Sequence, residues 1–106
     1  MKDIMTEYNK LIRDRIPEII RESGGDCEVF SVSGDCLYDY LDKKLDEEIA
    51  EFRESRSPEE IADVLEVLFA LAREKGVSEG ELMRIRDEKR EKRGGFEKGL
   101  VLVRSR

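Results

Sequence analysis

Two pairs of carboxylates lie on either side of a short polar break in the chain. The first pair is Glu48 and Glu51, and the second is Glu60 and Asp63. Each pair has the i, i+3 spacing that places both side chains on one side of a helix. If the chain reverses at residues 55–57, the two pairs face each other and four carboxylates converge. Such a cluster repels itself, and a bound divalent cation is the simplest means of stabilising it.

The ligand chemistry of this cluster favours a hard cation. Ligation by carboxylates alone suits Mg²⁺, with Mn²⁺ as a second choice, and does not suit Zn²⁺. An alternative explanation is that Glu60 completes a capping box with Ser57, because acids favour the first turn of a helix. That alternative accounts for Glu60 alone and not for the other three acids. The chain contains no histidine, so His-based catalytic triads are excluded.

Two helices are expected to position the four acids. In the first, which begins near Asp35, large apolar residues recur every three or four positions and form one stripe. Glu48 falls inside this stripe, whereas Glu47 points well away from it. The second has Ser57 as N-cap and Pro58 as its first residue, and it is apolar around more than half its circumference. This pattern predicts a buried central helix.

Further elements are expected at both ends of the chain. A short helix with Pro17 in its first turn precedes the break at residues 24–25, and a basic helix runs from Ser78 to the glycines at 94–95. Residues 27–32 and 100–103 are β-prone and could pair as a small ribbon. We therefore expect one domain over residues 1–106, mainly α, a four-helix-type antiparallel bundle with a minor two-stranded β ribbon.

Composition and charge narrow the class of partner. The net charge is −6, but residues 1–75 carry 20 acidic and 11 basic side chains (net −9), whereas residues 76–106 carry 6 acidic and 9 basic ones (net +3). An acidic chain is a poor binder of duplex nucleic acid. The sequence has no apolar run long enough for a membrane span and no signal-peptide pattern, so we expect a cytoplasmic protein.

Basic side chains that could contact phosphate occur in two places. Lys89 and Arg93 share one face of the last helix and lead into two glycines, where the backbone could approach an anion closely. Lys10 and Arg13 lie in a polar lead-in segment that could fold over a cleft, or could merely be the entry to the first helix. Most of the other cations near the end of the last helix are explained by its dipole and by solvation.

The acidic motif resembles that of a known family. Glu47-Glu48-x-x-Glu51 followed by Glu60-x-x-Asp63 is similar to the E-E-x-x-E…E-x-x-D signature of the all-α nucleoside triphosphate pyrophosphohydrolases, the MazG-like superfamily. Flanking motifs resemble its phosphoribosyl-ATP pyrophosphohydrolase-like branch: Tyr8-Asn9-Lys10-Leu11, Lys44-Leu45-x-Glu47-Glu48, Ala62-Asp63-Val64-Leu65-Glu66-Val67 and Arg93-Gly94-Gly95-Phe96. The resemblance spans about residues 8–103. The gap between the two acidic motifs is shorter than in many MazG-like proteins, which leaves the substrate undefined.

The resemblance implies a Mg²⁺-dependent enzyme that cleaves a nucleotide between its α and β phosphates, giving the monophosphate and pyrophosphate. It implies metal ligation by Glu48, Glu51, Glu60 and Asp63. Glu47 and Glu48 are the catalytic candidates, Glu47 as an orienter of the attacking water, and Lys10, Arg13, Lys89 and Arg93 are the substrate-binding candidates. It also favours a homodimer or higher homo-oligomer. The rival hypothesis is a noncatalytic helical module that senses nucleotides or binds a partner.

Overall fold

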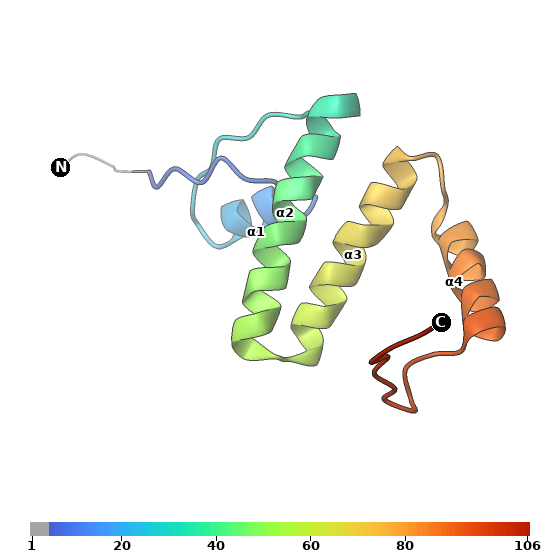
Figure 1. Ribbon diagram of the computed structural model, residues 1–106. Helices are drawn as coiled ribbons and strands as arrows, with labels where there is room; N and C mark the ends of the chain where they lie inside the picture. The colour runs from blue at the N-terminus through green and yellow to red at the C-terminus, as the bar shows by residue number, and fades with distance from the viewer. Residues whose placement is uncertain (1–4) are drawn as a thin grey trace.

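The computed structural model describes residues 5–106 and is mainly helical (Figure 1). The helices are α1 (Ile16–Glu22), α2 (Gly34–Ser55), α3 (Pro58–Glu74) and α4 (Glu79–Arg93). The helix bounds expected from capping residues and apolar periodicity are therefore confirmed. Oligomerisation stays a prediction.

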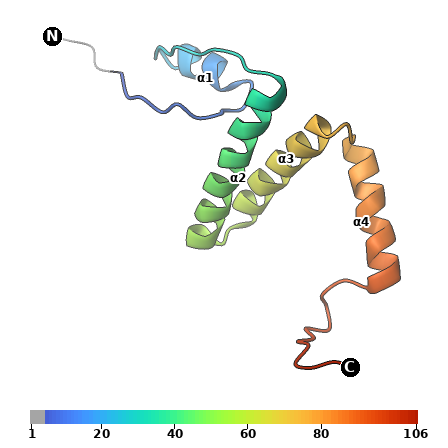
Figure 2. The same ribbon diagram turned by 45° about the horizontal axis from the view of Figure 1, so that its top comes forward.

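The predicted β ribbon is wrong, because residues 5–106 contain no strand. Residues 27–32 lie in the loop between α1 and α2, beside the start of α2, whereas residues 100–103 follow α4 and lie at the opposite end of the molecule (Figures 1 and 2). The two β-prone segments are thus too far apart to share backbone hydrogen bonds. A lone two-stranded ribbon is in any case marginal in water.

A tight reversal joins α2 to α3 and sets the register of the two acidic motifs. Arg56 adopts the left-handed conformation (φ 55°, ψ 27°), and its N–H donates to the Phe52 carbonyl at 2.6 Å. Ser57 then caps α3, accepting a hydrogen bond from the Glu60 N–H at 3.3 Å, and Pro58 provides the first helical residue. Only two residues separate the helices, so α2 and α3 run antiparallel and side by side (Figure 1).

The core of this hairpin is small. Leu41 on α2 and Val67 on α3 are the buried hydrophobic residues of the described chain, and Glu48 is buried with them. A carboxylate in so small a core needs a partner, because an isolated buried charge is strongly unfavourable. The hairpin is therefore built around an acid rather than around an apolar centre alone.

The expectation that α3 is a buried central helix is not met within one chain. Ile61, Leu65 and Leu68 remain exposed along one side of α3. The reason is visible in Figure 2: α4 meets α3 near their connecting turn and then diverges from it, so it does not cover that side. The radius of gyration is 18.6 Å, against about 13 Å for a compact domain of this length.

None of the helices within residues 5–106 is both long enough and apolar enough to span a membrane.

Candidate metal centre

Three of the four predicted ligands converge between α2 and α3. Glu48, Glu60 and Asp63 each offer a carboxylate oxygen, and these oxygens lie within 4.8 Å of one another. The geometry follows from the hairpin: the two-residue reversal brings the last turns of α2 opposite the first two turns of α3. Sequence spacing predicted this convergence.

Two oxygens of this cluster lack partners. Oε2 of Glu48 and Oε2 of Glu60 are buried and accept no hydrogen bond, and Glu48 as a whole is only 7% exposed. Buried carboxylate oxygens are normally hydrogen-bonded or bound to a cation. The unsatisfied pair is the feature of this structure that fits a metal ion.

Electrostatics in the cluster oppose full ionisation. Burial raises the pKa of Glu60 above its ordinary value of 4.5, and the negative charges of Glu51, Asp63 and Glu48 raise it further. Glu51 therefore lies close enough to act on Glu60 by charge. It is exposed and outside the group of three converging oxygens, so the structure does not bring the fourth predicted ligand into the cluster.

Two cations of the lead-in segment form ion pairs with acids of the two motifs. Arg13 Nη2 donates to Asp63 Oδ1 at 2.7 Å, and Lys10 Nζ donates to Glu47 Oε1 at 3.0 Å. The lead-in, which the sequence left as either a cover or a simple entry to α1, thus contacts both acidic motifs. Glu47 itself stands apart from the three converging oxygens and is bound by lysines.

Two lysines that hydrogen-bond to Glu47 keep its carboxylate ionised. Burial alone raises the pKa of Glu47, but hydrogen bonds from Lys10 and Lys44 outweigh it and hold the pKa below the ordinary value of 4.5. Reciprocally, the hydrogen bond to Glu47 raises the pKa of Lys10 above 10.5. Both groups therefore stay charged throughout the neutral range.

Lys44 is a site residue that the ligand and phosphate assignments missed. Its Nζ lies 3.3 Å from Glu47 Oε2 and 3.3 Å from Glu48 Oε1, and its side chain is only 16% exposed. The signal was present in the sequence, because Lys44 stands three residues before Glu47 and four before Glu48, the spacings at which helical side chains meet. Lys44 is the partly buried cation beside the carboxylate cluster.

Replacing Lys44 with glutamine is expected to lower the free energy of unfolding by about 1–3 kcal/mol, because two partly buried carboxylates lose their shared cation. Thermal unfolding of the metal-free protein measures the effect. Lys43→Gln is the matched control, since Lys43 is exposed on the same helix. Equal changes in the two variants would show that Lys44 does not hold these carboxylates.

A cavity of about 480 Å³ opens directly beside the cluster. Glu48, Asp63 and Lys44 line one part of it, and Arg13 of the lead-in lines another. Its apolar walls come from the lead-in and the two hairpin helices: Leu11, Ile12, Leu37, Leu41, Val67 and Ala70. The rest of its lining is charged and carries both signs, with Arg15 and Arg73 beside Asp14, Glu66 and Glu74. The volume is within the range of small-molecule sites.

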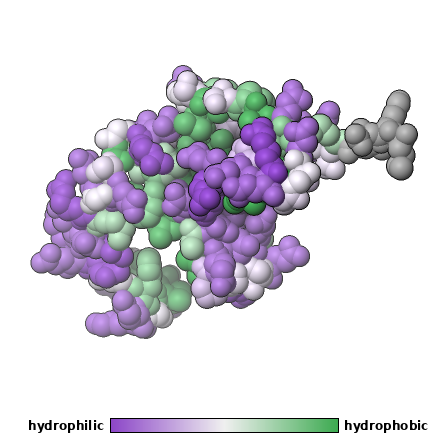
Figure 3. Space-filling model, turned by 180° about the vertical axis from the view of Figure 1, so that it is seen from behind, coloured by the Kyte–Doolittle hydropathy of each residue, from purple (hydrophilic) through white to green (hydrophobic). Residues whose placement is uncertain are grey.

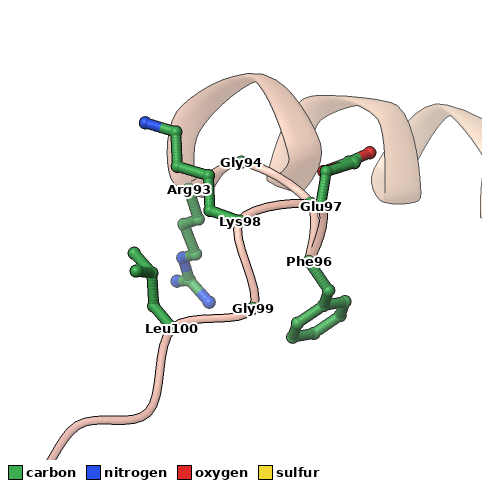
Figure 4. Close-up of a pocket in the computed structure, with 8 residues that line it drawn as sticks. Arg93, Gly94, Phe96, Glu97, Lys98, Gly99 and Leu100 are labelled. Carbon is green, nitrogen blue, oxygen red and sulfur yellow. The ribbon is translucent and has the colours of Figure 1, made fainter.

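The two predicted phosphate contacts on α4 lie elsewhere. Arg93 lines a separate cavity of about 500 Å³ formed by residues 93–100, and its side chain reaches toward Gly99 and Leu100 while Phe96 points away (Figure 4). None of the clustered carboxylates lines that cavity. Lys89 is exposed on α4, and α4 diverges from the hairpin (Figure 2). Within one chain, neither side chain is brought to the cluster.

Comparisons with known proteins give one relative and no family. The chain is 52% identical over 44 residues to an uncharacterized protein of Mycolicibacterium smegmatis (strain ATCC 700084 / mc(2)155). The match covers 42% of this chain and 45% of that protein, so it spans less than half of either. No family model matches the chain, and no solved structure matches it.

Proposed function

We propose that this protein is a Mg²⁺-dependent nucleotide pyrophosphohydrolase, which cleaves between the α and β phosphates to give a nucleoside monophosphate and pyrophosphate. The observation that carries the proposal is the convergence of Glu48, Glu60 and Asp63, with two buried unpartnered oxygens, beside a cavity whose charged lining includes Arg13 and Lys44. The resemblance of the two acidic motifs to the MazG-like signature supports the same reaction.

The residues present fit a magnesium ion. Three carboxylates from two facing helices supply the hard oxygen ligands that Mg²⁺ prefers, and the cation would neutralise a cluster whose members repel one another. Mg²⁺ commonly binds through one or two carboxylates together with substrate phosphates and water, so the three converging carboxylates suffice without Glu51. When bound, the ion supplies Lewis-acid activation of the phosphoryl group and of the attacking water.

Glu47 is assigned to orient the attacking water. The oxygen of water attacks the α phosphorus, the bond from that phosphorus to the bridging oxygen breaks, pyrophosphate leaves with the bonding electrons, and the proton of the water passes to solvent. Lys10 and Lys44 hold the Glu47 carboxylate ionised and fixed in direction, which suits it to accept a hydrogen bond from water, whereas its lowered pKa makes it a poor proton acceptor. Glu48 is assigned to the ion, with Lys44 steadying its other oxygen.

Arg13 and Lys10 are assigned to the phosphates. Both side chains are largely accessible, at 57% and 42% exposed, and both already lie against acidic groups. An ion held by Asp63 would compete with Arg13 for that carboxylate, and the guanidinium would then be available for two parallel hydrogen bonds to a phosphate. The positive charge of these two side chains would stabilise the negative charge that develops on the leaving pyrophosphate.

Affinity for Mg²⁺ is expected to fall as the pH is lowered, because ion binding requires the deprotonated carboxylates. The decrease should begin above pH 4.5, since the pKa of Glu60 is raised from that value. Calorimetric titration of Mg²⁺ at constant ionic strength, from neutral pH downward, checks this. An affinity that stays constant until well below pH 4.5 would remove Glu60 from the ligand set.

The proposed reaction is tested by measuring pyrophosphate release from canonical and modified nucleoside triphosphates and from phosphoribosyl-ATP, each with Mg²⁺, Mn²⁺ or EDTA. Release that depends on the metal and prefers one substrate supports the proposal and names the substrate. No release from any of them by folded protein would contradict it and favour a noncatalytic nucleotide-sensing or partner-binding module.

A further inference from the structure

The cavity beside the carboxylate cluster runs lengthwise along the α2–α3 hairpin. Its lining extends from Leu37 to Glu48 on α2 and from Asp63 to Glu74 on α3. On each helix the lining residues recur at the spacing of a single face, and this face is about 16 Å long at a rise of 1.5 Å per residue. Because the two helices are antiparallel, Glu48 and Asp63 lie at one end of the cavity, the cluster end, and Leu37 and Glu74 lie at the other.

The groups assigned to the ion and to phosphate lie at the cluster end. Glu48 is 7% exposed, and its buried Oε2 accepts no hydrogen bond. Arg13 lies there because it donates to Asp63 at 2.7 Å, and Lys44 lies there beside Glu48. Since α2 and α3 come together at the reversal (Figure 1), a nucleotide whose phosphates occupy this end extends along the cavity toward the other. The remaining length of the cavity is thus the place for a nucleoside.

The walls between the two ends are apolar. Leu41 and Val67 are buried in the hairpin, and Leu11 and Ile12 of the lead-in are half-buried against the same cavity. Seen from behind, hydrophobic atoms likewise run through the middle of the molecule, bordered by hydrophilic ones (Figure 3). Apolar walls next to a charged end suit the flat ring of a base, because burial of apolar surface supplies affinity while a few polar groups fix the orientation.

Ala70 is small, whereas the other apolar residues that line the cavity are leucine, isoleucine and valine. It follows Val67 by one turn of α3 and is half-buried, so a short side chain at this position leaves space inside the cavity. We propose that the part of the cavity lined by Leu37, Leu41 and Ala70 is a nucleoside subsite, and that Ala70 sets the size of the base that it accepts. This assignment of the two ends rests on the proposed function, which places the phosphates at the cluster end.

The remaining charged lining makes this subsite unsuitable for a further phosphate. It comprises three acids and two arginines, namely Asp14, Glu66, Glu74, Arg15 and Arg73. Arg15 is already paired with Glu18 at 3.2 Å, which leaves negative charge in excess. A phosphate without a metal ion would be repelled there, since bringing like charges together costs free energy. The substrate class that fits is a nucleoside triphosphate, and not phosphoribosyl-ATP, whose base carries a second sugar phosphate.

Calorimetric titration in Mg²⁺ with two kinds of probe tests the subsite. The first is inorganic triphosphate, which has no nucleoside. The second is the set of α,β-methylene analogues of ATP, GTP, CTP and UTP, which cannot be cleaved between the α and β phosphates. Ala70→Leu should weaken binding of the tightest analogue about tenfold or more, because the added atoms overfill the subsite. Binding of inorganic triphosphate should stay unchanged.

The matched control is Ala50→Leu, the same substitution at an exposed position of α2 outside the cavity, which should leave binding of both probes unchanged. Ala70→Val is a milder variant in case leucine prevents folding, and far-UV circular dichroism verifies that the helices remain. Equal affinity of the wild type and the folded Ala70 variants for the tightest analogue overturns the subsite. So does equal weakening of inorganic triphosphate binding, and so does a wild type that binds no analogue more tightly than inorganic triphosphate.

Phosphoribosyl-ATP tests the substrate class. On rapid mixing, before turnover, it should displace the methylene analogue of ATP less effectively than ATP does, by about tenfold or more, because the lining is acidic. Equal or better displacement overturns the class. Since the methylene analogues are not cleaved, their binding is measured whether or not the protein is a hydrolase. A size effect at Ala70 without pyrophosphate release from any triphosphate overturns the hydrolase alone, and release without the size effect overturns the subsite alone.

Discussion

Replacing Asp63 with asparagine is expected to abolish Mg²⁺-dependent pyrophosphate release while the fold survives. Asparagine keeps the shape of the side chain but removes the charge that would hold the ion. Loss of activity should be about a hundredfold or more, since replacing a residue that only supports a metal ligand already costs about 10- to 100-fold. The fold should tolerate the change because Asp63 is 37% exposed and its partner Arg13 is 57% exposed, and such pairs contribute little to stability.

The measurement is pyrophosphate release at saturating Mg²⁺, with circular dichroism on the same samples. Asp46→Asn is the control, because Asp46 is an exposed acid on α2 and its loss changes the net charge equally. Full activity in Asp63→Asn would show that the ligand assignment is wrong. Loss of activity in both variants would point to a general effect of charge instead of ion binding.

The helical part of the structure and the carboxylate cluster could be predicted from local rules. Ser57 and Ser78 cap the helices that follow them. A break of only two residues also makes α2 and α3 pack antiparallel against each other. Once two helices are antiparallel about a known reversal, the facing positions are fixed by periodicity. That is why the sequence alone predicts that Glu48, Glu60 and Asp63 lie together.

Features that depend on tertiary position could not be predicted. The β-prone character of residues 27–32 and 100–103 is a local property, but pairing requires the two segments to meet, and the path of α4 keeps them apart. The charges of Lys89 and Arg93 and the glycines that follow them predict a phosphate contact. Where these side chains lie, however, depends on the direction of α4, which is set by its turn after α3. The pairing of Lys10 with Glu47 joins residues 37 positions apart, which no local pattern encodes.

The second large effect is expected from Glu60→Gln, which should stabilise the metal-free domain and remove most of its response to Mg²⁺. Burial and three neighbouring acids raise the pKa of Glu60, so its ionised form destabilises the fold above pH 4.5. A neutral glutamine relieves that repulsion and can donate a hydrogen bond to the cluster. As the pH falls through the raised pKa, the wild type becomes protonated, and its difference from the variant should disappear.

In the wild type, Mg²⁺ at about a hundred times its dissociation constant should stabilise the fold by about 2.7 kcal/mol, an increase in Tm on the order of 10 °C. Thermal unfolding of the wild type and of Glu60→Gln, each with Mg²⁺ and with EDTA, gives the four Tm values for this comparison. Glu59→Gln is the control, because Glu59 is the exposed neighbour of Glu60. A noncatalytic module would be stabilised by Glu60→Gln, but Mg²⁺ would not stabilise the wild type. A metal centre requires both effects, because the cation relieves the same repulsion that destabilises the empty cluster.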